Sequence, residues 1–308
     1  MDMKKRYTDF PAYISGKLGC RVQKLSIDAG FTCPNRDGTK GYGGCSFCNN
    51  ESFNPVYCRS YTSISEQLRV GKEFFEHKYK SQAYLAYFQS YSNTYAPFER
   101  LRKAYEEALR YPGICGLVIG TRPDTVDGRI LDYLEYLARS CYVCVEYGVE
   151  SMKDEVLVRI NRGHNVEDSL KAIEMTAGRG IDIAAHIICG LPGESEEETL
   201  VGVEALSVLP VNILKLHQLQ IIKDTPMASD YEIHPEDYRL YTLEEYLDTA
   251  VSVLERIRGD ICVERFVNQA PSEYVVAPLW GIKNFEFTDK LRKRLEERNT
   301  WQGRFFIR

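Results

Sequence analysis

Residues 28–50 read DAGFTCPNRDGTKGYGGCSFCNN and hold three of the ten cysteines of this 308-residue chain. Cys33, Cys45 and Cys48 follow a strand-like segment at 24–30, with eleven and two residues between them. The loop is rich in glycine, which lets backbone N–H groups turn toward an anionic centre. Three thiolates can bind three irons of a four-iron cluster and leave the fourth iron open. The spacing therefore indicates a cluster-binding loop.

A zinc site is the alternative for these cysteines, with Cys58 as the fourth ligand. Structural zinc sites usually combine two closely spaced pairs, and Cys58 has no near partner in the sequence, so the spacing favours the cluster. Cys141-x-x-Cys144 also has the spacing of a metal or redox pair. It stands in CYVCVEYGV (141–149), which is typical of a buried strand whose residues i and i+3 face opposite sides.

The six strand-like segments of the chain alternate with helix-like segments, so the sequence predicts a sheet of parallel strands covered by helices. The strands are expected at 24–30, 82–89, 115–121, 141–149, 181–190 and 211–222, and the helices at 63–80, 97–110, 127–139, 166–179, 195–209 and 242–257. Six units are too few for a closed eight-unit barrel. We expect a partial (β/α)6 TIM-like barrel of the α/β class over residues 21–260, with extensions at 1–20 and 261–308.

Composition restricts the function classes. The net charge of −5 argues against nucleic-acid binding through the whole surface, although a local basic patch is compatible with it. The segment from 288 to 308 offers such a patch, with Lys290, Arg292, Lys293 and Arg294 as candidate phosphate contacts; a solvated helix face is the alternative. No apolar run approaches the roughly 20 residues that span a bilayer. The N-terminus lacks the apolar core of a secretory signal, so we expect a cytoplasmic protein without membrane contact.

Further motifs after the cysteine loop point to a known family. Phe47 before the last cysteine is a feature in which the segment resembles the radical S-adenosylmethionine (SAM) superfamily. The wide cysteine spacing, together with TRPD (121–124), VEYGVES (145–151), INRGH (160–164) and HIICGLPGES (186–195), is similar to the branch that contains the catalytic subunit of elongator. Within that branch the chain resembles a short bacterial group typified by the proteins called YhcC and YtqA, over about residues 20–270.

The resemblance implies that Cys33, Cys45 and Cys48 ligate a [4Fe–4S] cluster and that SAM is the second cofactor. It also implies positions for SAM contacts. Ser90, Ser92 and Asn93 stand where many relatives have a Gly-Gly-Glu motif that holds the SAM amino group. The glutamate of that motif is absent here.

The same resemblance places Glu150 and Ser151 near the ribose of SAM, Arg162 near its carboxylate, and Gly190 beside its adenine. A guanidinium suits a carboxylate partner. Glu150 is alternatively a carboxylate at a helix N-terminus. Arg122 and Asp124 are candidate substrate contacts or, alternatively, a structural ion pair.

Two strand histidines and one loop histidine remain. His186 and His217 lie in apolar strands, where a lone histidine is more often a satisfied core residue than a ligand. His164 is ambiguous. No side chain is predicted to act as acid, base or nucleophile, because reductive cleavage of SAM is chemistry that the cofactors carry.

Elongator-type relatives modify carbon 5 of the wobble uridine of tRNA and carry an acetyltransferase domain after the barrel. The segment after residue 260 is too short for such a domain. The resemblance therefore implies remodelling of an existing substituent, and the bacterial group is connected with the methylaminomethyl-uridine pathway. It implies tRNA and a flavodoxin or ferredoxin-type reductant as partners. The alternatives are a radical SAM enzyme for a small metabolite and a cluster-bearing redox or regulatory protein.

Overall fold

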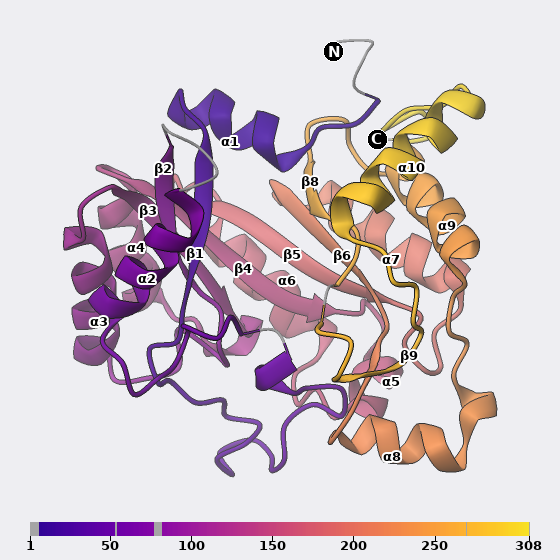
Figure 1. The fold of residues 1–308 in the computed structure, drawn as a ribbon, viewed down its shortest axis with the longest axis horizontal. Helices are drawn as coiled ribbons and strands as arrows, with labels where there is room; N and C mark the ends of the chain where they lie inside the picture. Colours follow the sequence, from indigo (N-terminus) through magenta and orange to yellow (C-terminus); the bar gives the residue numbers. More distant parts are fainter. Residues whose placement is uncertain (1–5, 53, 77–81, 269, 308) are drawn as a thin grey trace.

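The computed structural model describes residues 6–52, 54–76, 82–268 and 270–307 (Figure 1). Within these residues, seven parallel strands form one sheet in the order β1-β2-β3-β4-β5-β6-β8. The strands are β1 (Val22–Ile27), β2 (Ala83–Phe88), β3 (Ile114–Thr121), β4 (Tyr142–Glu150), β5 (Asp182–Cys189), β6 (Ile213–Gln218) and β8 (Cys262–Arg265). The strands of this sheet follow one another in chain order, and the sheet curls into a partial barrel. The predicted α/β partial barrel is confirmed, with seven strands in place of six.

Helices connect most of the strands and cover the convex face of the sheet, whereas the first helix packs across the amino ends of the strands (Figure 1). They are α1 (Phe10–Leu18), α2 (Ile64–Glu76), α3 (Phe98–Arg110), α4 (Gly128–Ala138), α5 (Asp154–Arg159), α6 (Val166–Thr176), α7 (Glu196–Val208), α8 (Pro226–Ile233), α9 (Leu243–Arg256) and α10 (Asn284–Glu297). The helix predicted at 63–80 is described to Glu76, and residues 77–80 of that prediction lie outside the described residues.

Capping side chains set where several helices begin. Ser195 accepts a hydrogen bond from the N–H of Glu198, whose carboxylate accepts one from the N–H of Ser195, so α7 begins with a capping box. Asn165 and Asp168 do the same for α6. Such caps satisfy N–H groups that have no partner within the helix, and each typically contributes about 1 kcal/mol.

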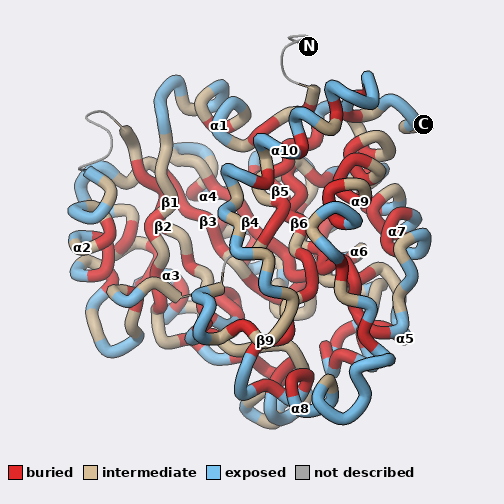
Figure 2. The backbone as a smooth tube through the Cα atoms, turned by 45° about the vertical axis from the view of Figure 1, so that its right-hand side comes forward, coloured by how far each residue is buried: buried red, intermediate tan, exposed pale blue. Residues whose placement is uncertain are grey.

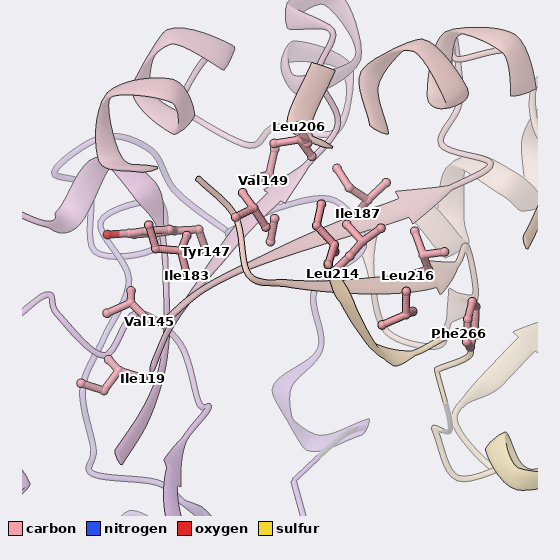
Figure 3. Close-up of a cluster of buried hydrophobic side chains, with 14 of the residues drawn as sticks. Ile119, Val145, Tyr147, Val149, Ile183, Ile187, Leu206, Leu214, Leu216 and Phe266 are labelled. Carbon is pink, nitrogen blue, oxygen red and sulfur yellow. The ribbon is translucent and has the colours of Figure 1, made fainter. Parts of the chain in front are cut away.

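The convex face of the sheet carries the main core. On β4, alternate residues Val143, Val145, Tyr147 and Val149 are buried against the helices. Figure 3 shows three of them beside apolar side chains of the next strands, which are Ile183, Ile187, Leu214 and Leu216. Burial of one such side chain stabilises the fold by roughly 1.5–3 kcal/mol. In Figure 2 the central strands of the sheet are largely red, the edge strand β1 is largely tan, and the outer helix faces are pale blue, as expected for helices that cover one face of a sheet.

The concave face is layered. At the amino ends of the strands, Ile14 of α1 packs on an apolar layer that includes Leu85, Val118 and Cys144. Farther along the same strands the inward residues are polar, and they line the cavity described below. Cys144 is therefore a buried apolar contact, as the sequence predicts, whereas Cys141 lies just before β4 and its thiol donates to the carbonyl of Leu137.

The expected boundary at residue 260 does not coincide with the end of the sheet, because β8 lies beyond it and pairs with β6. The terminal segments also pack on the barrel. The side-chain amide of Gln302 donates to the carbonyl of Ile261 (2.7 Å), and the backbone N–H of Gln302 donates to the carbonyl of Arg6 (2.9 Å).

The sixth predicted strand, 211–222, is shorter in the structure. β6 ends at Gln218, and β7 (Ile221–Ile222) instead pairs antiparallel with β9 (Val275–Ala277). Among the helices of the described residues, none has the length and apolar character needed to cross a membrane.

Candidate active site

A cavity with a volume of about 250 Å³ opens at the carboxyl ends of the strands, near the lower end of the roughly 300–1,000 Å³ usual for small-molecule sites. Glu146 and Glu150 of β4 both line it, and a strand rises about 3.3 Å per residue, so the cavity extends along the strand by roughly 13 Å. We distinguish two levels. The rim comprises Cys33, Cys45, Cys48, Arg122, Glu150 and Arg162, and the floor comprises Tyr87, Glu146, His186, His217 and Arg265.

The cysteine loop is folded by its own backbone. The N–H groups of Arg36 and Asp37 donate to the carbonyl of Cys33 at 2.8 and 3.2 Å, and the N–H of Gly44 donates to the carbonyl of Asn35 at 2.8 Å. Gly44 has a φ of +85°, and a Cβ there would lie 2.7 Å from Arg36 Nε. Only glycine fits this turn, which brings the second and third cysteines back to the cavity.

Nitrogen donors surround the sulfur atoms. Cys45 Sγ accepts from Arg162 Nη1 at 3.3 Å and from Asn35 Nδ2 at 3.7 Å, and Cys48 Sγ accepts from Asn50 Nδ2 at 3.8 Å. Burial and the neighbouring Cys45 thiol raise the pKa of Cys48 to about 11, while the guanidinium of Arg36 acts in the opposite direction. Thiols lose their protons when they bind a metal, and N–H donors stabilise the resulting sulfur charge.

These residues fit a cluster better than a single ion. Within the part of the chain that the structure describes, no group of three His, Cys, Asp or Glu side chains is arranged to hold one metal ion. The ligands of a four-iron cluster bind different irons, so their sulfur atoms stand farther apart. Cys58 is buried and is not among the described residues that line the cavity, and burial raises the pKa of its thiol to about 12. This placement argues against Cys58 as a fourth ligand to zinc.

Arg162 and Glu150 meet at the rim. Arg162 Nη2 donates to the carbonyl of Gly148 at 2.6 Å and lies 3.5 Å from Glu150 Oε1. Its Nε is buried and has no hydrogen-bond partner in the described part of the chain. Glu150 has a φ of +71°, a left-handed conformation that is uncommon for residues other than glycine. Burial raises the pKa of Glu150 even though Arg162 and Arg122 lower it. The pair presents one donor and one carboxylate to the cavity.

Arg122 and Asp124 form a two-pronged ion pair at the rim. Arg122 Nε and Nη2 donate to the two oxygens of Asp124 at 2.8 and 2.9 Å, and Lys40 Nζ lies 2.6 Å from the same carboxylate. Burial opposes ionisation of Asp124, but hydrogen bonds from Arg122 outweigh it and lower its pKa. Arg122 Nη1 also donates to the carbonyl of Arg162 at 2.7 Å. The ion pair thus positions Arg162, and Arg122 itself faces the cavity.

The other residues expected to contact SAM point away from the cavity. Among the described lining residues are Gln89 and Tyr91, but not Ser90, Ser92 or Asn93. The hydroxyl of Ser92 bonds the hydroxyls of threonines on the next strand and turn, and Asn93 Nδ2 donates to backbone carbonyls. Ser90 Oγ accepts from Asn54, which follows the cysteine loop. The segment therefore reaches the cavity through the residues on either side of Ser90.

Ser151 and Gly190 are likewise outside the described lining. Ser151 Oγ donates to Glu194 Oε1 at 2.5 Å. Gly190 has a φ of +91°, and a Cβ there would lie 3.0 Å from the ring of Tyr241. Ile188, two residues earlier on β5, faces the cavity instead. His164 is buried beside the rim, and its Nε2 lies 3.2 Å from the carbonyl of Gly148, to which it donates in the tautomer that carries the proton on Nε2.

The floor was missed by the sequence analysis. Glu146 Oε1 lies 2.6 Å from Lys24 Nζ, and its Oε2 lies 2.8 Å from Lys215 Nζ and 3.3 Å from His186 Nε2. Burial alone would raise the pKa of Glu146, but the two lysines hold it well below its ordinary value. Burial and Lys215 lower the pKa of His186 to about 4, so this imidazole is neutral at pH 7.

The strand period of two is the signal in the sequence that could have indicated the floor residues. Lys215 and His217, like Glu146 and Gly148, are two positions apart inside apolar strands, so each pair lies on one face of its strand. His186 and His217 are thus cavity residues and not core residues, which corrects the sequence interpretation. Their ring centroids are 5.5 Å apart.

The basic residues expected to contact phosphate lie on α10, away from the cavity. Arg294 bonds Asp248 and lies 2.5 Å from Glu244, and Arg292 lies 3.8 Å from Asp9. Asp9 pairs with the amino end of β8, so this stretch of α10 is near the opposite edge of the sheet from the cysteine loop. Figure 1 places α10 and α1 at the top, with α5 and α8 at the bottom. The role of Lys290, Arg292, Lys293 and Arg294 stays a prediction.

Two family models match successive segments of the chain. The model of the Radical SAM superfamily matches residues 33–202, and that of the Radical_SAM C-terminal domain matches residues 211–297.

Individual relatives agree with this match. The protein YtqA of Bacillus subtilis is 32% identical over 99% of this chain and 94% of its own length. A tRNA uridine(34) acetyltransferase of Methanocaldococcus infernus is 24% identical, over 65% of this chain and 38% of that enzyme. The solved structure of Methanocaldococcus infernus Elp3 with an N-terminal deletion has the same fold, with a TM-score of 0.68 and 18% identity over 91% of this chain and 64% of that one.

Proposed function

The chain belongs to the radical SAM superfamily, and we propose that it remodels the carbon-5 substituent of the wobble uridine of tRNA. The chain is a radical SAM enzyme, and members of this family use a [4Fe–4S] cluster and SAM. With the cluster held by Cys33, Cys45 and Cys48, and SAM beside it, the cofactors would supply the radical chemistry that removes a hydrogen atom from the substrate. The chain's own residues position SAM and the substrate and exclude water.

We assign the cofactors to the rim. Cys33, Cys45 and Cys48 would hold three irons, with Arg162 and Asn35 donating to sulfur. Arg162 Nε has no partner within the described ranges, and Arg162 lines the cavity beside Glu150. A SAM carboxylate would accept from this Nε, and a SAM ammonium would pair with the carboxylate of Glu150. Backbone groups next to Gln89 would serve in place of the absent Gly-Gly-Glu motif.

Similarity to the tRNA uridine(34) acetyltransferase carries the substrate proposal. It covers 65% of this chain but only 38% of that enzyme. We infer that the two share the radical step on uridine and not the whole reaction. YtqA, which is matched over 94% of its length, would then catalyse the same reaction as this chain.

The rim offers a place for a nucleoside extruded from a loop. Tyr91 lines the cavity and is partly exposed, and the guanidinium of Arg36 lies 5.7 Å from the centre of its ring. Tyr42 in the cysteine loop is 79% exposed. Unstacked RNA bases bind to aromatic and guanidinium planes, so these side chains suit the bases on either side of an extruded uridine.

Deleting the gene tests the substrate. In cells without it, we expect the tRNA nucleosides to lose one 5-substituted wobble uridine and to accumulate its precursor, because no radical then attacks the substituent. Mass spectrometry of nucleosides from both strains measures this change. Complementation with a Cys45→Ala gene, which removes a cluster ligand, should leave the precursor in place. An unchanged profile would defeat the tRNA proposal and favour a small-metabolite substrate.

Replacing Arg162 with glutamine should weaken SAM binding about tenfold or more, because a charge-assisted hydrogen bond is worth roughly 1.5–3 kcal/mol. Isothermal titration of the cluster-loaded protein with SAM measures the affinity. Arg159→Gln is the matched control, since Arg159 is nearby but pairs with Asp237 at the surface. Equal affinities for the Arg162 variant and the control would contradict the assignment.

A further inference from the structure

Three polar atoms in the cavity have no partner among the residues that the structure describes. Of the nine buried side-chain nitrogen and oxygen atoms without a hydrogen bond among the described residues, three belong to lining residues: Arg162 Nε, Gln220 Oε1 and Arg265 Nε. A buried donor without an acceptor is costly, so a ligand is expected to complete it. Arg162 belongs to the proposed SAM site at the rim, whereas Arg265 lies at the floor and has no role there.

The neighbour of Arg265 defines a second donor. Arg265 Nη2 lies 3.0 Å from His217 Nε2. A guanidinium only donates, so Nε2 must be the acceptor and the proton of the neutral imidazole must be on Nδ1. Burial and Arg265 keep the pKa of His217 well below its ordinary value, which agrees with a neutral ring. Arg265 Nε–H and His217 Nδ1–H are thus two donors from neighbouring strands.

The charges of the floor do not cancel. Lys24 and Lys215 are balanced by Glu146 and Glu264, with nitrogen–oxygen distances from 2.6 to 3.6 Å. In the described ranges no carboxylate forms an ion pair with Arg265, so three cations face two anions and leave one positive charge.

We propose that Arg265 and His217 bind a carboxylate of the substrate at the floor of the cavity. A planar carboxylate matches the donors of a guanidinium in geometry and charge. The carboxylate of SAM has its proposed partner in Arg162, which bonds the carbonyl of Gly148, so Arg265 at the floor is left for a different acid. Resting on the proposed function, this inference assigns the carboxylate to the uridine substituent; a free carboxylic acid is the other source.

A binding experiment tests the site without tRNA. Trifluoroacetate is added to the anaerobic cluster-loaded protein, and its fluorine NMR line is recorded. We expect broadening with the wild type and with Arg110→Gln, a control on the exposed surface of α3, and at least about tenfold weaker binding with Arg265→Gln. Arg265→Lys keeps the charge and should retain part of the broadening, and iron content shows that each variant is folded. Equal broadening with Arg265→Gln and wild type would overturn the site.

A turnover experiment tests the substrate. The wild type and Arg265→Gln are given tRNA from the deletion strain, either native or with its carboxylates converted to amides, and nucleoside consumption is measured. Amidation should lower the wild-type kcat/KM about tenfold or more and change that of Arg265→Gln little, since its anion site is already lost. If Arg265 were merely structural, Arg265→Gln would lower kcat/KM for native and amidated tRNA equally, and the variant would stay sensitive to amidation. Either that result or a wild-type kcat/KM that amidation does not change would overturn the inference.

The two experiments separate the inference from the function on which it rests. If trifluoroacetate binding depends on Arg265 but native tRNA is not consumed, the tRNA proposal fails while the anion site stands, with a free carboxylic acid as its ligand.

Discussion

Replacing Cys45 with alanine is expected to abolish cluster binding. Reconstituted anaerobically with iron and sulfide, the wild type should bind about four irons per chain, and the variant should bind essentially none after desalting. Cys45 is buried at the rim, and its sulfur accepts from Arg162 and Asn35, so no other thiol can replace it without moving the loop. Iron and sulfide analysis and the visible absorbance of the cluster measure the loss. Cys33→Ala and Cys48→Ala should behave in the same way.

Cys58→Ala and Cys144→Ala are the matched controls for this loss. Both thiols are buried, but Cys58 is outside the described lining of the cavity and Cys144 packs in the apolar layer under α1. Each variant should keep the full iron content and lose at most some stability. Stoichiometric zinc in protein purified without oxygen, lost in Cys58→Ala, would instead identify the four-cysteine zinc site.

The sheet could be predicted from the sequence because its strands are buried on both faces. The run Cys141–Val149 is almost continuously apolar, and such runs separated by amphipathic helices indicate parallel strands. β8 was missed because it lacks such an apolar run: it is short and ends in Glu264 and Arg265. Its place is fixed by pairing with β6, which local periodicity does not report.

The rim was predicted in part, since motifs give positions along the chain but not the direction of each side chain. Arg162, Glu150 and Arg122 line the cavity, and their contacts to SAM and substrate stay predictions. Ser92, by contrast, bonds threonine hydroxyls of the next strand and turn, because alternate residues after β2 point to opposite sides. A polar residue in a motif can therefore hold neighbouring segments together and need not line the cavity.

The floor could not be predicted, because its charges are paired between strands that are far apart in sequence. Lys24, Glu146 and Lys215 come from β1, β4 and β6 and compensate one another only once the barrel has formed. Each residue taken alone resembles an isolated polar position in an apolar strand. The net charge of the floor, and with it the case for an anion, appears only when all the partners are counted.

Glu146→Gln is expected to destabilise the protein by about 3–5 kcal/mol, because removal of one partner leaves buried charges without compensation. The carboxylate has no exposed surface, and Lys215 retains only the more distant Glu264, at 3.6 Å. Urea unfolding of the wild type and the variant gives the two free energies of unfolding. Glu106→Gln is the control, since Glu106 pairs with the exposed Arg110 on α3 and should cost less than about 0.5 kcal/mol.

The pH dependence of this difference tests its electrostatic cause. In the folded protein the lysines hold the pKa of Glu146 well below its ordinary value of 4.5, although burial opposes them. A group with a lowered folded pKa contributes stability that is fully present above the unfolded value and is lost as pH falls through the folded value. The difference between wild type and Glu146→Gln should therefore be constant at neutral pH and shrink below about pH 4.5. A difference that persists unchanged in acid would point to lost packing in place of lost charge compensation.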